Sequence, residues 1–265
     1  MPRARRHFIP GHIWHITHRC HKKEFLLKFA KDRQRWMHWL FEAKKRYGLV
    51  VLNFMITSNH IHLLVTDDDS KDVISRSMQS VASRTAQEYN WRKKRKGAYW
   101  EDRYHATAIE RDDHLFRCIV YLDLNMVRAG VVTHPSDWGF SGYNEIQNPC
   151  KRYALINYQR LMQLLNIQTV EELKKSHSGW IEEALRNNSS IRASKWVKSV
   201  AVGSKEFVEM TKENLGFQVK GRRVSRSGDN YQLREQQTAY RPLFAPENSS
   251  LSDDNTYFWD ESDVI

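Results

Sequence analysis

The chain reads Phe54-Met55-Ile56-Thr57-Ser58-Asn59-His60-Ile61-His62-Leu63-Leu64-Val65 over residues 54–65. Val, Ile and Leu are frequent from residue 49 onward, and neither Gly nor Pro interrupts the run. This pattern predicts two antiparallel strands, over 49–57 and 59–66, with a turn near Ser58 and Asn59. Because side chains alternate faces along a strand, His60 and His62 are expected to point the same way.

Two imidazoles on one face of a strand can hold a single divalent cation, since imidazole is the commonest side-chain metal ligand. A pair of this kind also arises by chance in a chain with 12 histidines. A histidine in a strand is often an ordinary core or edge residue. The pair alone therefore leaves both interpretations open, and a second motif further along the chain favours the metal site.

That motif lies on a helix predicted over 112–129. Acidic residues precede the first turn, Gly130 supplies the end, and apolar residues fall at 116, 119, 120, 124 and 127. Tyr121 and Asn125 are four residues apart and so share one helix face. A tyrosine beside a bound cation is a candidate nucleophile, and an amide oxygen one turn away can complete a metal site. Taken alone, the two residues also fit a core tyrosine and a polar C-terminal residue.

The order of the motifs resembles the HUH endonuclease superfamily, specifically single-tyrosine transposases of the insertion-sequence-200-like type. Within these it is most similar to the REP-associated tyrosine transposases. One departure is Met126, where relatives usually have Pro after the Asn. The matching segments follow the family's order and are Ile13–Arg19, Met55–Leu64, Trp100–His105, Tyr121–Gly130 and Ser136–Tyr143.

The resemblance implies a metal-dependent transposase that cuts and rejoins single-stranded DNA near hairpins through a 5′-phosphotyrosine intermediate. It implies that Tyr121 is the nucleophile and that Mg²⁺ or Mn²⁺ is held by His60, His62 and Asn125. Further matched positions are candidates for touching DNA or supporting the ligands, and a purely structural role fits them equally well: His15, Arg19, Arg103 and His105.

Charge distribution agrees with a DNA partner. The formal net charge is +11, and residues 1–150 hold 25 of the 42 Lys and Arg but 16 of the 31 Asp and Glu. A basic region is typical of proteins that bind polyanions. The sharpest cluster has aromatic neighbours that can stack on unpaired bases, although a solvated loop explains it equally well. Its candidate DNA contacts are Arg92, Lys93, Lys94 and Arg95.

Composition also excludes some classes. No apolar run approaches the length that a membrane span needs, and no apolar stretch follows the basic start as in a signal peptide. Three widely spaced cysteines suit a reducing compartment and predict no zinc site. We therefore expect a cytoplasmic, nucleoid-associated protein with no membrane partner. Whether it is a monomer or a homodimer stays open.

Besides the segments above, the sequence predicts strands over 7–19 and 98–110, a helix over 30–47 and a helix ending near residue 92. The resulting order of elements, β-α-β-β-α-β-α, indicates an α+β fold. We expect a ferredoxin-like antiparallel sheet with helices on one face, plus a C-terminal helical extension. The expected division is a transposase domain over 1–145, a helical extension over 146–216, and an irregular region over 217–265. That last region contains a basic loop over 221–226 and ends in an acidic tail.

Three alternatives remain. The chain could be a domesticated, non-catalytic module that binds single-stranded nucleic acid, although the joint presence of His60, His62, Tyr121 and Asn125 favours retained chemistry. It could be a rolling-circle initiator or relaxase of the same superfamily. Many of those carry a second nearby tyrosine, whereas residues 117–130 contain one. A metal-dependent hydrolytic nuclease would leave no covalent adduct.

Overall fold

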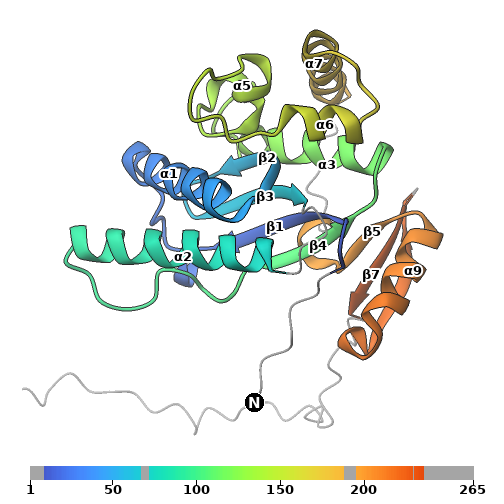
Figure 1. The fold of residues 1–265 in the computed structure, drawn as a ribbon, viewed down its shortest axis with the longest axis horizontal. Coiled ribbons are helices and arrows are strands. Elements are labelled where there is room, and N and C mark those ends of the chain that lie inside the picture. Colours follow the sequence, from blue (N-terminus) through green and yellow to red (C-terminus); the bar gives the residue numbers. More distant parts are fainter. Residues whose placement is uncertain (1–8, 67–71, 188–194, 229, 236–265) are drawn as a thin grey trace, which may run out of the picture. The chain divides into compact units, whose positions relative to one another are not determined.

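The computed structural model describes residues 9–66, 72–187, 195–228 and 230–235. Within them, one seven-stranded sheet has the order β2-β3-β1-β4-β5-β7-β6 (Figure 1). All neighbouring strands are antiparallel except the parallel pair β4 and β5. The strands are β1 (Ile13–Arg19), β2 (Val50–Ile56), β3 (His60–Thr66), β4 (His105–Ile109), β5 (Ala201–Gly203), β6 (Arg222–Ser227) and β7 (Asn230–Glu235).

Helices lie on both faces of this sheet. The α-helices are α1 (Ala30–Tyr47), α2 (Val73–Arg92), α3 (Asp113–Asp123), α4 (Asn125–Arg128), α5 (Gly142–Gln147), α6 (Tyr158–Leu164), α7 (Val170–Arg186), α8 (Lys195–Lys198) and α9 (Lys205–Leu215). Short 3-10 turns cover His21–Lys23, Pro135–Asp137 and Gly216–Val219.

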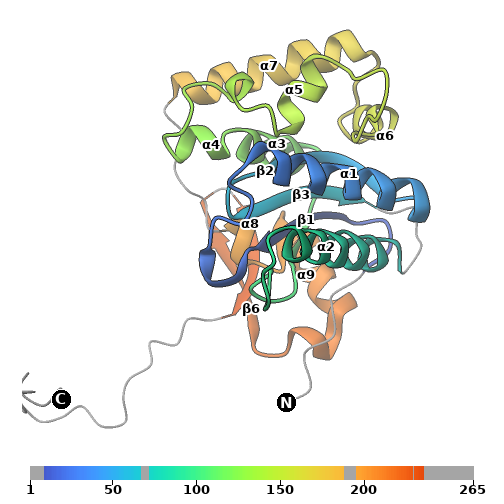
Figure 2. The same ribbon diagram turned by 90° about the vertical axis from the view of Figure 1, so that its left-hand side faces the viewer.

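The first two helices pack side by side on one face (Figure 1). Trp100 joins α2 to that face, because its indole donates to the carbonyl of Ala82 and stacks on His18 of β1. α3 lies over the other face, where Asp123 accepts a hydrogen bond from Asn53 of β2. Figure 2 shows α7 on the far side of α3 from the sheet.

Strand register fixes which side chains share the face beneath α3. β1 runs between β3 and β4, with Thr17 opposite both His62 and His105 and Arg19 opposite His60. Cross-strand partners lie on the same face of a sheet. His60 and His62 therefore lie at one end of the sheet on the same face as the basic and polar side chains of β1 and β4.

The α+β prediction is confirmed, and so are the helix over 30–47 and the two strands around Ser58. The structure differs in detail, because α3 covers the second face, whereas the sequence predicts helices on one face. The helix predicted over 112–129 is interrupted at Leu124, which has ψ near 5°. The strand predicted over 98–110 is formed only by His105–Ile109.

The C-terminal part also departs from the prediction. Strands β6 and β7 pair as a β-hairpin that extends the sheet through β5. The irregular region expected from residue 217 and the basic loop expected over 221–226 are therefore wrong for the residues of these strands. The pairing is non-local, since Ala201 of β5 aligns with Ala108 of β4, and it buries Leu233 completely. The acidic end of the chain lies outside the described residues. No helix in the described part is both long and apolar enough to cross a membrane.

Candidate active site

A cavity of about 680 Å³ opens where β1, β3 and β4 meet α3 and α4. It brings together the predicted nucleophile, the three predicted metal ligands and several basic side chains. Arg128, which the sequence reasoning did not single out, also lines it. The lining includes Tyr121, His60, His62, Asn125, Arg19, Arg103, His105 and Arg128.

A chain of hydrogen bonds sets the tautomer of His62. The Nδ1 of His15 lies 2.8 Å from the carbonyl oxygen of Trp196, and its Nε2 lies 2.9 Å from the Nδ1 of His62. A carbonyl only accepts, so Nδ1 of His15 carries the hydrogen. Burial lowers the pKa of His15 to about 3, so its ring is neutral and its Nε2 accepts from His62. His62 therefore carries its own hydrogen on Nδ1 and keeps a lone pair on Nε2.

The amide of Asn125 meets that lone pair, because its Nδ2 lies 3.1 Å from Nε2 of His62. The turn before β3 orients His60 in a similar way. Its Nδ1 lies 2.7 Å from Oδ1 of Asn59 and 2.9 Å from the hydroxyl of Thr57. Since Nδ1 of His60 is engaged, Nε2 is the nitrogen suited to a ligand in each ring of the pair. The two ring centroids are 4.9 Å apart.

These donors fit a small divalent cation. Among the residues that the structure describes, no three His, Cys, Asp or Glu side chains form a metal site. The Asn125 amide, 3.1 Å from Nε2 of His62, is the nearby side chain of another type that could add a third ligand. Half a turn about its terminal bond would exchange the amide nitrogen for the oxygen. Two imidazoles and an amide oxygen form a mixed set that Mn²⁺ accepts readily and that Mg²⁺ accepts less well.

Tyr121 is 7% exposed and lies on α3 against this histidine cluster. Its ring centroid is 6.0 Å from that of His62 and 6.2 Å from that of His15, both edge-on. The guanidinium of Arg128 lies 4.2 Å from the ring centroid and also donates to the backbone carbonyl of Tyr121. Arg128 is two helical turns beyond Tyr121, and this spacing was the signal that could have identified it. No comparable spacing in the sequence indicates that Trp196 would lie beside His15 and Tyr121.

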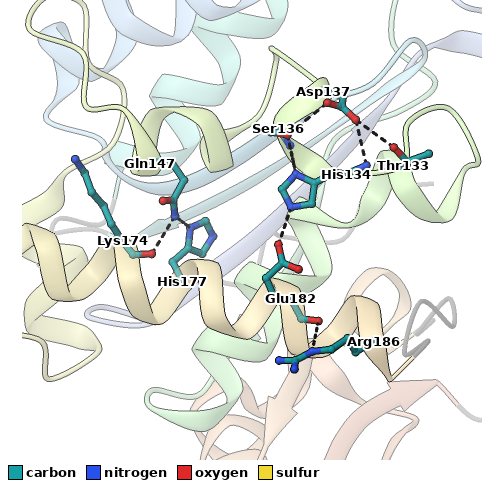
Figure 3. Close-up of polar contacts among 9 residues, drawn as sticks. All are labelled: Thr133, His134, Ser136, Asp137, Gln147, Lys174, His177, Glu182 and Arg186. Atoms are coloured by element: carbon teal, nitrogen blue, oxygen red, sulfur yellow. Dashed lines mark hydrogen bonds and ion pairs between the residues drawn. The ribbon is translucent and has the colours of Figure 1, made fainter.

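A buried pair anchors α3 from behind. His177 of α7 and Asp123 of α3 are fully buried, with 2.7 Å between Nε2 and Oδ2. Asn53 of β2 donates to the other carboxylate oxygen. Nε2 of Gln147, on α5, lies 3.0 Å from Nδ1 of His177 (Figure 3). These bonds tie the helix that carries the nucleophile to the sheet and to the C-terminal extension.

The segment Ser136–Tyr143 braces the strand that precedes the histidine turn. The indole of Trp138 donates to the carbonyl of Ile56 at 2.9 Å, and the amide of Ile56 donates to the carbonyl of Phe140 at 3.0 Å. The end of β2 is thereby fixed on its free side. Ser136–Tyr143, one of the segments in which the sequence resembles the transposase family, therefore has a structural role.

The predicted DNA contacts fall into two groups. Arg19, Arg103 and His105 line the cavity, with Nε2 of His105 held 2.9 Å from the carbonyl of Ser199. The second group, residues 92–95, lies outside the cavity lining at the end of α2. There Arg92 pairs with Asp32 and Arg95 with Glu24, whereas Lys93 and Lys94 are exposed.

Comparison with known proteins identifies a related family. Residues 9–122 match the family model described as "Transposase IS200 like". The structure of a REP-associated tyrosine transposase bound to a REP hairpin is 18% identical, covers 60% of this chain and 95% of that chain, and has a TM-score of 0.47. A candidate transposase from Deinococcus radiodurans R1 is 14% identical, covers 44% of this chain and 92% of its own, and has a TM-score of 0.32.

No curated protein matches the chain. The matched residues include the histidine pair and Tyr121, while Asn125 lies just beyond them. This match confirms that the N-terminal part of the chain, residues 9–122, resembles the IS200-like transposases.

Proposed function

We propose that this protein is a transposase that cuts and rejoins single-stranded DNA near hairpins through a covalent tyrosine link. The observation that carries the proposal is the convergence of Tyr121, His60, His62 and Asn125 on one cavity with basic walls. The family match over residues 9–122 supports the same activity. A non-catalytic binding module would have no need for this combination of side chains.

The proposed chemistry is an in-line phosphoryl transfer. The phenolic oxygen of Tyr121 forms a bond to the scissile phosphorus, and the bond from phosphorus to the 3′ oxygen breaks. The phenolic proton ends, in the net reaction, on the departing 3′ oxygen. A 5′-phosphotyrosine and a free 3′-hydroxyl result. Because one phosphodiester replaces another, attack by a 3′-hydroxyl on the link reverses the step at little cost in free energy.

The cavity residues have separate tasks in this step. Arg19 and Arg103 attract the DNA backbone, and Arg128 keeps the Tyr121 ring in place. The metal ligands would be Nε2 of His60 and His62 together with the Asn125 amide oxygen. A bound Mg²⁺ or Mn²⁺ supplies positive charge to the scissile phosphate.

The test is a search for the covalent adduct. A labelled hairpin oligonucleotide with single-stranded flanks is incubated with protein and Mn²⁺, then run on a denaturing protein gel. We expect a labelled protein band that is absent in Tyr121→Phe and without metal. It should persist in the control Tyr153→Phe, which alters a tyrosine that is 76% exposed. Cleavage without a band would instead indicate a hydrolytic nuclease, and a native-gel shift without cleavage would indicate a binding module.

The same assay addresses the oligomeric state. Tyr121→Phe and His62→Ala each remove a different part of the site. If the nucleophile of one subunit serves the metal ligands of its partner, mixing the two inactive variants restores adduct formation. If each subunit carries its own complete site, the mixture stays inactive.

A further inference from the structure

A second cavity, of about 400 Å³, lies between α3, α7 and α8. Tyr121 and Arg128 line both cavities, so the second adjoins the first at the predicted nucleophile. The helices α7 and α8 that close it lie beyond residues 9–122, the part that matches the transposase family. The predicted chemistry uses no other side chain of this second cavity.

The walls of the second cavity are aromatic. The rings of Phe116 and Trp180 stack with centroids 5.2 Å apart and planes 29° apart, and both are partly exposed to the cavity. Trp196 lies on another side, with its ring 6.1 Å from that of Tyr121. Aromatic faces of this kind stack on unpaired bases whatever their sequence.

Charges around the second cavity distinguish a base from a phosphate as its occupant. Arg117, Arg128 and Lys195 place positive charge around it, which favours a polyanion nearby. Glu183 also lines it, and its negative charge would repel a phosphate seated inside. A carboxylate instead accepts hydrogen bonds from an exocyclic amino group. The arrangement suits a base inside and its phosphates outside.

We propose that the second cavity binds one unpaired nucleobase of the strand next to the scissile phosphate. This inference rests on the proposed function, because a strand held at Tyr121 must continue past that residue in one direction or the other. The ring of Trp180, backed by Phe116 on its other face, stacks on the base, and Arg117 and Lys195 contact the adjoining phosphates. Glu183 favours a base with an amino group over thymine.

Binding to a scanned set of oligonucleotides tests the proposal. Hairpins with single-stranded flanks each carry one abasic site, and affinity is measured by fluorescence anisotropy in EDTA, which prevents metal-dependent cleavage. We expect one flank position at which loss of the base weakens binding to the wild type by about tenfold. Trp180→Ala should weaken binding to the intact strand by a similar factor and show no further loss at that position.

The controls separate stacking from general damage. Phe217→Ala removes an aromatic ring that is 93% exposed and lines neither cavity, so it should keep both the affinity and the abasic profile of the wild type. Trp180→Leu serves if Trp180→Ala fails to fold, and far-ultraviolet circular dichroism verifies folding. A flat abasic profile in the wild type would overturn the proposal, as would an unchanged profile in the folded Trp180 variant.

These failures can be told apart from failure of the proposed function. A protein that forms the Tyr121 adduct but shows a flat abasic profile keeps its proposed activity and loses only the base site. A protein that binds no single-stranded DNA loses both. At the responsive position, replacing the native base by thymine should weaken binding in the wild type but not in Glu183→Gln.

Discussion

His15 shows how one side chain can act through another. Its ring lies edge-on to Tyr121, and its Nε2 fixes which nitrogen of His62 keeps the lone pair. Partners of metal-bound histidines typically contribute 10- to 100-fold to metal affinity. His15→Phe should therefore weaken Mn²⁺ binding by about that factor, as measured by calorimetry without DNA. The fold should survive, because Thr107 still donates to the Trp196 carbonyl.

The matched control for that measurement is His38→Phe, which changes an exposed histidine on α1. Its Mn²⁺ affinity should equal that of the wild type. An unchanged affinity in His15→Phe would mean that His15 has a packing role only.

Burial of the same histidine predicts a pH dependence of stability. The folded pKa of His15 is about 3, below its ordinary value of 6.5, because burial penalises the charged ring. Between these values the unfolded chain binds a proton that the folded chain does not, so stability falls as the pH falls, by about 1.4 kcal/mol per pH unit. Urea unfolding of the metal-free protein from pH 7 to 4 measures the slope. In His15→Phe, the slope of the free energy of unfolding against pH should be shallower by the equivalent of about one proton. Equal slopes in the two proteins would contradict a lowered pKa for His15.

At the scale of elements, local sequence patterns predicted those helix ends that are determined by neighbouring residues. The helix over 30–47 ends as expected at Gly48, whose φ of +76° suits glycine. The sequence did not reveal the break at Leu124, because apolar spacing continues through it. Tyr121 and Asn125 nevertheless both line the cavity, because the interruption at Leu124 leaves the two side chains on the same side of the helix. The convergence of these residues was thus predictable from spacing together with the family resemblance, while the exact helix geometry was not.

A buried hydrogen bond between His177 and Asp123 contributes to the attachment of α7 to α3. Removing the side chain that hydrogen-bonds a buried carboxylate typically costs about 3 kcal/mol or more, because the carboxylate stays buried without that partner. His177→Leu should destabilise the protein by that order, measured by urea unfolding at pH 7. His134→Ala is the control, since His134 contacts the half-exposed Glu182 of the same helix (Figure 3) and should cost under about 1 kcal/mol.

Adding Asp123→Leu to His177→Leu should recover part of the loss, because the double variant leaves no buried carboxylate without its partner. Strict additivity of the two losses would show that the two side chains do not interact energetically.

At the scale of the whole molecule, non-local pairing explains what the sequence could not reveal. Strand β5 has three residues and pairs in parallel with β4, so no local signal announces it. Residues 221–226 read as a basic loop because the basic and polar side chains of β6 are exposed or half-buried. The carbonyl of Trp196 reaches His15 only because α8 packs near β1 and β4. The C-terminal part therefore contributes to the cavity as well as covering it.

The charge distribution allows a last prediction about DNA binding. The net charge of +11 implies salt-dependent affinity, but the cations differ in position. Arg103 lines the cavity, whereas Arg95 lies outside it and is held by Glu24 at 3.2 Å. For single strands, each phosphate contact contributes about 0.7 to the slope of log affinity against log salt. Arg103→Gln should reduce the magnitude of that slope by about 0.7, and Arg95→Gln should leave it unchanged. The opposite result would place the DNA on the end of α2 and not in the cavity.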